Sequence, residues 1–89
     1  MQAITDEVKA DLLVRLRRIE GQVRGVQRML ESDRDCQEVL QQLAAVRSAL
    51  QNASLIFARR YALQCLHDPE AGMDDEQLIE QLVAVLSKA

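Results

Sequence analysis

The chain has 89 residues, enough for one small domain, and Phe57 and Tyr61 are its only aromatic side chains. Leu, Ala, Val, Gln, Glu and Arg dominate, a composition typical of helical assemblies. The net charge of −3 combines a basic segment over residues 9–28 (local charge +4) with an acidic segment over residues 68–89 (local charge −5). We expect one all-α domain over residues 1–89, which is small enough to need an oligomeric partner to enlarge its core.

Several functional classes find no support in the sequence. No apolar run approaches the about 20 residues that span a bilayer, so we expect no membrane role. The N-terminus lacks a positive region followed by an apolar core, which favours a cytoplasmic location. There is no Ser, His, Asp set, no glycine-rich phosphate loop and no carboxylate pair near a histidine, so we expect no enzymatic activity.

The first predicted helix covers about six turns and ends near residue 31. Its apolar residues recur at steps of three and four, which draws one stripe along a helix. They are Val8, Leu12, Leu16, Ile19, Val23, Val26 and Leu30. Ser32 or Asp33 is expected to cap the next helix by accepting a hydrogen bond from an unpaired N–H.

The second predicted helix is long, because no proline or glycine falls between Glu31 and His67. Its apolar stripe continues at steps of three and four through Val39, Leu43, Val46, Leu50, Ala53 and Phe57. A helix of over 30 residues is longer than the first helix can cover. We therefore expect a helix from another subunit to cover the remainder.

Pro69 and Gly72 predict a turn after the second helix. Asp74 or Asp75 then starts a short third helix. Its apolar residues are expected to face inward: Leu78, Ile79, Leu82, Val83, Val85 and Leu86.

Two cysteines, Cys36 and Cys65, stand 29 positions apart on the second helix. At the rise of an α-helix this separates the two thiols by roughly 43 Å, far beyond disulfide or shared-ligand range. If two copies of the helix pack antiparallel and cross at Leu50 and Gln51, Cys36 of one copy lies beside Cys65 of the other. A symmetric dimer would carry two such dithiol sites.

Reduced cytosolic thiols are candidates for metal binding or redox chemistry. Cys36 falls in the first turn of its helix, where the dipole favours a thiolate, although Asp33 and Asp35 oppose this effect. Two thiolates bind Cu(I) linearly, and Tyr61, one turn before Cys65, occupies the position of a third ligand. A structural zinc site usually takes four protein ligands, more than these residues provide, and no resident cofactor is expected. The alternative is that each cysteine is a small, inert, buried residue.

Basic residues suggest a DNA-binding surface without a helix-turn-helix, since the helices are too long and the turns fall in the wrong places. Guanidinium forks suit phosphate oxygens. The alternative is a solvated face paired with Asp11 and Glu20. The candidate DNA-binding residues are Arg15, Arg17, Arg18, Gln22 and Arg24, extended in an oligomer by Arg47.

Three stretches carry a family resemblance: Arg15 to Gly25 (RLRRIEGQVRG), Met29 to Glu31 with Cys36, and Gln42 to Leu50 (QLAAVRSAL). They closely resemble the CsoR/RcnR family of bacterial transcriptional repressors, over nearly the whole chain. The resemblance implies a three-helix protomer, an antiparallel helical dimer and a disc-shaped tetramer. It also implies binding to operator DNA that ends when an inducer reacts at an inter-subunit site.

In the family that the chain resembles, the residues at the site determine which inducer is sensed. Copper sensors carry a histidine four residues before the second cysteine, where this chain has Tyr61. Nickel and cobalt sensors use a histidine near the N-terminus, where this chain has Ala3, and formaldehyde sensors have proline where it has Gln2. Two cysteines without the histidine are similar to the sulfur-responsive CstR branch, which senses persulfides and polysulfides.

We therefore expect a repressor that responds to a small sulfur species. The resemblance implies that the Cys36 thiolate attacks the sulfur donor and that Cys65 of another subunit completes a cross-link, which lowers DNA affinity. A Cu(I)-responsive repressor of copper-resistance genes, using Cys36 and Cys65 as ligands, is the first alternative. A helical adaptor that binds no DNA is the second.

Overall fold

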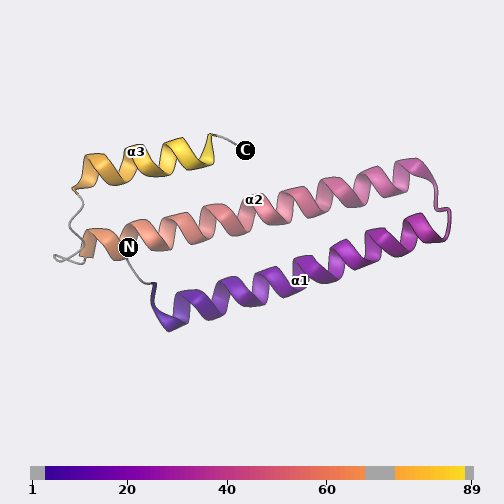
Figure 1. Cartoon of the computed structure of the whole chain (residues 1–89), viewed down its shortest axis with the longest axis horizontal. Helices are drawn as coiled ribbons and strands as arrows, with labels where there is room; N and C mark the ends of the chain where they lie inside the picture. Colours follow the sequence, from indigo (N-terminus) through magenta and orange to yellow (C-terminus); the bar gives the residue numbers. More distant parts are fainter. Residues whose placement is uncertain (1–3, 68–73, 88–89) are drawn as a thin grey trace.

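The computed structural model describes residues 4–67 and 74–87 and confirms the all-α prediction for them. Three helices follow in chain order, α1 (Asp6–Glu31), α2 (Cys36–His67) and α3 (Asp75–Leu86). Figure 1 shows α1 and α2 as a long antiparallel hairpin, with α3 running beside the C-terminal part of α2. The protomer is elongated, with extents of 54 × 26 × 15 Å. None of the helices in the described part is both long and apolar enough to cross a membrane.

Helix α1 ends where its sequence predicts, and it begins at Asp6, ahead of the first residue of the predicted stripe. Thr5 is its N-cap, and the Thr5 hydroxyl accepts a hydrogen bond from the Val8 N–H at 3.3 Å. Asp6 and Glu7 place negative charge in the first turn, where it complements the helix dipole. Val8, Ile19 and Val26 of the predicted stripe are buried.

The turn between α1 and α2 corrects the capping prediction. Ser32 and Asp33 end α1, and neither caps α2: the Asp33 N–H donates to Leu30 O (3.3 Å) and the Arg34 N–H donates to Met29 O (2.9 Å). This pair of bonds, with Asp33 at φ 55°, is a Schellman motif. Aspartate tolerates the left-handed conformation because its short polar side chain bonds locally. The turn therefore places Cys36 at the first position of α2.

The core of the hairpin is a seam with a seven-residue spacing. Ile19 and Val26 of α1 meet Val39, Val46 and Ala53 of α2 in one buried cluster. A spacing of seven keeps the same faces together along two nearly antiparallel helices. Leu12, Leu16, Met29 and Ala49 pack against the cluster. The hairpin buries Val39, Val46 and Ala53 of the predicted α2 stripe, whereas Leu43 and Leu50 of the same stripe stay exposed in the described protomer.

Much of the apolar surface of α2 stays uncovered within the described protomer. Large apolar side chains along its whole length are at least 45 % exposed: Leu40, Leu43, Leu50, Leu55, Leu63 and Leu66. Large exposed apolar side chains in this number mark an interaction surface. The prediction that α2 needs more than α1 to cover it is consistent with these exposures.

Helix α3 begins as predicted. Asp74 is its N-cap and forms a capping box with Gln77: the Gln77 N–H donates to Asp74 Oδ1 (2.7 Å), and the Asp74 N–H donates to Gln77 Oε1 (3.3 Å). The prediction that all its apolar residues face inward is wrong within the described protomer, because only Leu78 of them is buried. Leu82 is half-buried, while Ile79, Val83, Val85 and Leu86 are exposed. The predicted turn at Pro69 and Gly72 lies outside the described residues.

Candidate sensing site and DNA-binding surface

The structure places the two cysteines at opposite ends of one unbroken helix. Cys36 is the first residue of α2 and Cys65 lies two residues before its end at His67. The helical rise therefore separates them by roughly 43 Å within a chain, as the sequence predicts. Cys36 is exposed and Cys65 is buried, with 5 % of its surface accessible. The interpretation of both cysteines as buried core residues is wrong for Cys36.

Tyr61 lies one turn before Cys65, and the two side chains interact. A hydrogen bond to Cys65, followed by burial and the charge of the Cys65 thiolate, raises the pKa of the Tyr61 phenol above its usual 10.0. Because the bond favours the protonated phenol, the Tyr61 O–H is its donor and the Cys65 sulfur is its acceptor. Tyr61 is therefore a neutral donor beside the thiol at neutral pH.

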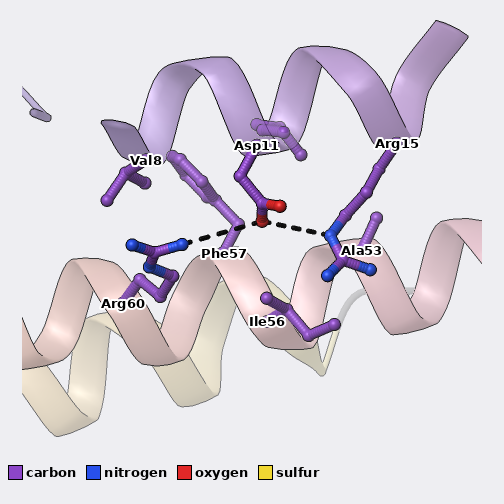
Figure 2. A pocket seen from close by; sticks show the side chains of 8 residues that line it. Val8, Asp11, Arg15, Ala53, Ile56, Phe57 and Arg60 are labelled. Atoms are coloured by element: carbon purple, nitrogen blue, oxygen red, sulfur yellow. Dashed lines mark hydrogen bonds and ion pairs between the residues drawn. The ribbon is translucent and has the colours of Figure 1, made fainter. Parts of the chain in front are cut away.

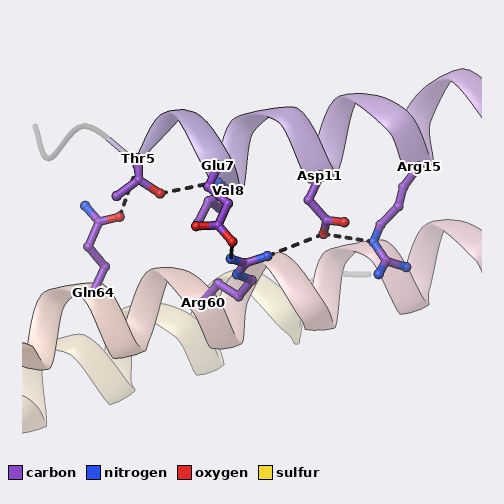
Figure 3. A network of polar contacts seen from close by, with 7 residues as sticks. All are labelled: Thr5, Glu7, Val8, Asp11, Arg15, Arg60 and Gln64. Carbon is purple, nitrogen blue, oxygen red and sulfur yellow. Dashed lines mark hydrogen bonds and ion pairs between the residues drawn. The ribbon is translucent and has the colours of Figure 1, made fainter.

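The end of α2 that carries Cys65 is held by the residues at the start of the hairpin. The Thr5 N–H donates to Gln64 Oε1 at 3.3 Å, which ties the start of α1 to the residue before Cys65 (Figure 3). Helix α3 packs on α2 as well and runs beside its C-terminal part (Figure 1). His67 is exposed at the end of α2. In residues 4–67 and 74–87, no three His, Cys, Asp or Glu side chains form a metal-binding group.

The candidate DNA-binding residues are mostly exposed on α1. Arg17, Arg18, Gln22 and Arg24 are exposed, as is Arg47 of α2, while Arg15 is half-buried. The register that brings Thr5 to Gln64 and Asp11 to Arg60 puts Arg47 level with the stretch from Gln22 to Arg24. Among the described residues, Arg17, Arg18 and Arg47 make no ion pair. Their guanidinium groups are therefore available to an external anion.

The two acidic partners expected for the basic face are present. Asp11 Oδ2 accepts from Arg15 Nε at 3.1 Å, and Glu20 lies 3.8 Å from Arg24. Both are pairs at positions i and i+4 on α1, and the Glu20 pair is largely exposed. Exposed pairs of this kind contribute little to stability and compete weakly with phosphate.

Asp11 makes a second contact that the sequence analysis missed. Arg60 of α2 approaches Asp11 Oδ2 at 3.8 Å and Glu7 Oε1 at 3.6 Å, so a chain of ion pairs joins the two helices (Figure 3). Figure 2 shows the Asp11 carboxylate between the two guanidinium groups, above a shallow depression that Ala53, Ile56 and Phe57 line on α2. The signal available in the sequence was the hairpin register, because an antiparallel fold at residues 32–35 places Asp11 opposite Ile56, one turn from Arg60, whose long side chain can span that distance.

The known proteins that this chain is similar to are transcriptional repressors. Residues 8–88 match the family described as metal-sensitive transcriptional repressor. The copper-sensing transcriptional repressor CsoR of Bacillus subtilis is 42 % identical over 80 residues, covering 90 % of this chain and 79 % of that protein. The copper-sensing transcriptional repressor RicR of Mycobacterium tuberculosis is 48 % identical over 52 residues, covering 58 % of this chain and 54 % of that protein.

Solved structures agree in fold. The copper-sensing repressor CsoR with Cu(I) from Geobacillus thermodenitrificans has a TM-score of 0.75 at 32 % identity and covers 99 % of this chain and 92 % of that chain. The nickel-responsive transcriptional regulator InrS has a TM-score of 0.71 at 33 % identity, with coverages of 99 % and 96 %. The copper-sensing names among these relatives support the family and not the sulfur-responsive branch that the resemblance suggested.

Proposed function

Because the chain belongs to the CsoR/RcnR family of metal-sensitive transcriptional repressors, we propose that its DNA binding is controlled at a site made by Cys36 and Cys65 of the partner subunit. The family is one of DNA-binding repressors, which confirms the prediction that the chain is not an enzyme. The observation that carries the proposal is the continuity of α2 from Cys36 to His67. Only a second chain can bring the two thiols within bonding distance.

The proposed assembly follows from the uncovered face of α2. Two copies packed antiparallel about Leu50 and Gln51 would cover Leu40, Leu43 and Leu50, which share a side of α2 with both cysteines, and would bring each Cys36 to a Cys65 of the partner subunit. The exposed apolar residues of α3 supply a further surface for assembly into the tetramer that the family resemblance implies. In such an assembly the arginines of α1, with Arg47, form the proposed surface for operator DNA.

Cu(I) is the inducer that the named relatives favour. Two thiolates are soft donors and can hold Cu(I) in a linear site. Cys36 and Cys65 of the partner subunit would provide both sulfurs. The Tyr61 phenol, a hard oxygen donor kept protonated by its raised pKa, is a poor third ligand. Cu(I) bound here would be two-coordinate and would fix the geometry of two α2 helices across the dimer.

A sulfane-sulfur donor is the second candidate, and Tyr61 is the observation that favours it. In this mechanism the exposed Cys36 thiolate attacks a sulfane sulfur and displaces the rest of the donor as a thiolate. The Cys65 thiolate of the partner subunit then attacks the sulfur of Cys36 and releases hydrosulfide. The two thiols lose two electrons, which the sulfane sulfur gains. The product is a disulfide between subunits.

Either inducer is proposed to act on the basic surface. Linking two α2 helices at the Cys36 and Cys65 positions changes how the α1 helices of the two chains are oriented, since each α1 packs along its own α2. Phosphate contacts that require several arginines at fixed spacing are then lost together. The affinity of the uninduced protein should therefore fall steeply with salt concentration, because each phosphate contact releases counterions.

The test compares the two inducers on the reduced protein bound to a DNA duplex that the protein itself selects from a random-sequence pool. Cu(I), buffered by a competing chelator, and an inorganic polysulfide are added separately, and DNA release and intact mass are recorded. Release by stoichiometric Cu(I), without a mass change after the metal is removed, supports copper. Release by polysulfide, with a covalent dimer in non-reducing mass analysis, supports sulfur. Failure to select any DNA contradicts the proposed function.

The Tyr61→His variant sharpens the choice. A histidine at position 61 would supply a nitrogen donor one turn from Cys65, completing a three-ligand site. If copper is the inducer and two sulfurs hold it, the variant should bind Cu(I) more tightly than the natural chain. Tyr61→Phe is the matched control, because it removes the phenol oxygen without adding a ligand. Equal Cu(I) affinity in all three proteins would show that position 61 does not face the site.

A further inference from the structure

We infer that Asp11 is a positioning residue for DNA binding, which holds the Arg15 guanidinium by its Nε and leaves its two terminal nitrogens for a DNA phosphate. The inference rests on the proposed function, because it requires that Arg15 contact DNA. Asp11 itself is not proposed to touch DNA. A carboxylate beside a DNA-binding arginine would by its charge alone repel phosphate. The structure gives reasons to expect the opposite effect.

The first reason is the geometry of the Asp11 and Arg15 pair. Asp11 accepts from the Nε of Arg15, at 3.1 Å, which is the nitrogen nearest the aliphatic stem. Figure 2 shows the contact from the carboxylate reaching Nε, with the two terminal nitrogens of Arg15 below it, on the α2 side. An arginine held at Nε keeps its terminal N–H groups for a bidentate contact to phosphate. The bond orients Arg15 and leaves those groups unused.

The second reason is that Asp11 also has an ion-pair partner on the other helix. Its Oδ2 lies 3.8 Å from Arg60 of α2, and Arg60 lies 3.6 Å from Glu7 of α1. The Asp11, Arg15 and Arg60 side chains are all only about one third exposed. A carboxylate with partners on two helices loses less freedom when it binds Arg15 than an exposed one does. Part of the conformational entropy that the Arg15 side chain would lose on binding DNA is therefore already lost in the free protein.

The contrast with Glu20 isolates this effect. Glu20 pairs with Arg24 at the same i, i+4 spacing on the same helix, but the separation is 3.8 Å and both side chains are more than 60 % exposed. In the described structure Glu20 has no partner on α2. Removing Glu20 deletes a negative charge near the basic surface without releasing a held arginine. Removing Asp11 deletes the same charge and releases Arg15.

The network also reaches the sensing end of α2. Arg60 is the residue before Tyr61, whose phenol donates to Cys65. A movement of this turn of α2 relative to α1 would change the distance from Arg60 to Asp11 and with it the hold on Arg15. The positioning role therefore gives one physical contact between the proposed DNA surface and the turn that carries the site.

The experiment measures the affinity of each variant for a duplex that the natural protein selects from a random-sequence pool, over a range of salt concentrations. Asp11→Ala is expected to weaken binding by about tenfold or more, the loss of one charge-assisted contact. It should also reduce the slope of log affinity against log salt by about one contact. Glu20→Ala should leave affinity unchanged or raise it. Asp11→Asn, which keeps an acceptor for Nε, should stay within about threefold of the natural chain.

Two further measurements separate positioning from folding. Thermal unfolding by circular dichroism reports whether each variant is folded, and Asp11→Ser replaces Asp11→Ala if the alanine variant unfolds at the assay temperature. In an Arg15→Ala background, removing Asp11 should no longer weaken binding, because the group it positions is gone.

Three results would overturn the inference: tighter binding by Asp11→Ala, an equal loss with and without Arg15, or no loss on Arg15→Ala alone. A natural protein that selects no DNA would instead overturn the proposed function.

Discussion

The two ends of α2 carry the same side chain in opposite surroundings. At its start, Cys36 follows a tight turn and is exposed to solvent. Near its end, Cys65 is buried, beside the Tyr61 phenol, where the first residues of α1 and the helix α3 approach α2. A site that joins the two ends across a dimer is therefore chemically unequal: it combines an accessible thiol with a protected one that already has a hydrogen-bond donor.

This inequality assigns different roles to the two sulfurs. An inducer arriving from solvent meets Cys36 first, and the response requires Cys65 of the partner subunit to become available afterwards. If Cu(I) is the inducer, the same order applies to ligand binding. The comparison thus predicts a stepwise response, which three measurements on the two ends of α2 can test.

The largest expected difference is in thiol reactivity. Cys36 of the reduced, native protein should react with iodoacetamide faster than Cys65, on the order of a hundredfold if exposing Cys65 costs about 3 kcal/mol of local opening. Labelling rates followed by mass spectrometry on Cys36→Ala and Cys65→Ala give each thiol separately. Equal rates, or faster labelling of Cys65, would contradict the assignment of Cys36 as the first thiol.

The next difference is in stability. Cys65→Ala should lower the free energy of unfolding by about 1–2 kcal/mol, since it removes a buried side chain, whereas Cys36→Ala should change it by less than about 0.5 kcal/mol. Urea unfolding at one fixed protein concentration measures both, because the stability of an oligomer depends on concentration. A larger loss for Cys36→Ala would place Cys36, and not Cys65, in a packed environment.

The smallest signal is the titration of Tyr61, which is clean because the chain has one tyrosine and no tryptophan. The phenol pKa is raised in the folded protein, chiefly by the hydrogen bond to Cys65. The stability that this bond adds is therefore present below about pH 10 and is lost as the pH rises through the folded pKa. Ultraviolet titration of Cys65→Ala should show a lower phenol pKa than the natural chain. An unchanged value would mean that burial alone raises it.

The sequence predicted the helices well because each follows from local rules. The steps of three and four from Val8 to Leu30 mark α1, and the absence of proline and glycine from Glu31 to His67 marks α2. The turn was harder. Ser32 and Asp33 are residues that favour N-caps, yet here the positive φ of Asp33 ends α1, and sequence alone does not choose between these uses.

For the candidate site, the sequence predicted the positions of the two cysteines better than the burial and contacts of each. The separation of the cysteines follows from counting along one helix, and the structure agrees. The difference in burial between Cys36 and Cys65 does not follow, because it depends on how α1 and α3 pack around one end of α2. The contact from Asp11 to Arg60 was missed for the same reason, since it needs the register of the hairpin. The apolar residues of α3 were predicted to be buried, but a single chain leaves most of them exposed.

The central claim, that Cys36 lies beside Cys65 of the partner subunit, is tested most directly with single-cysteine variants. Cys65→Ala keeps only Cys36, and Cys36→Ala keeps only Cys65. Each variant is oxidised with diamide alone and after the two are mixed under conditions that allow subunit exchange. An antiparallel α2 pair predicts a covalent dimer only in the mixture. Efficient cross-linking of either variant alone, or none in the mixture, would contradict the account.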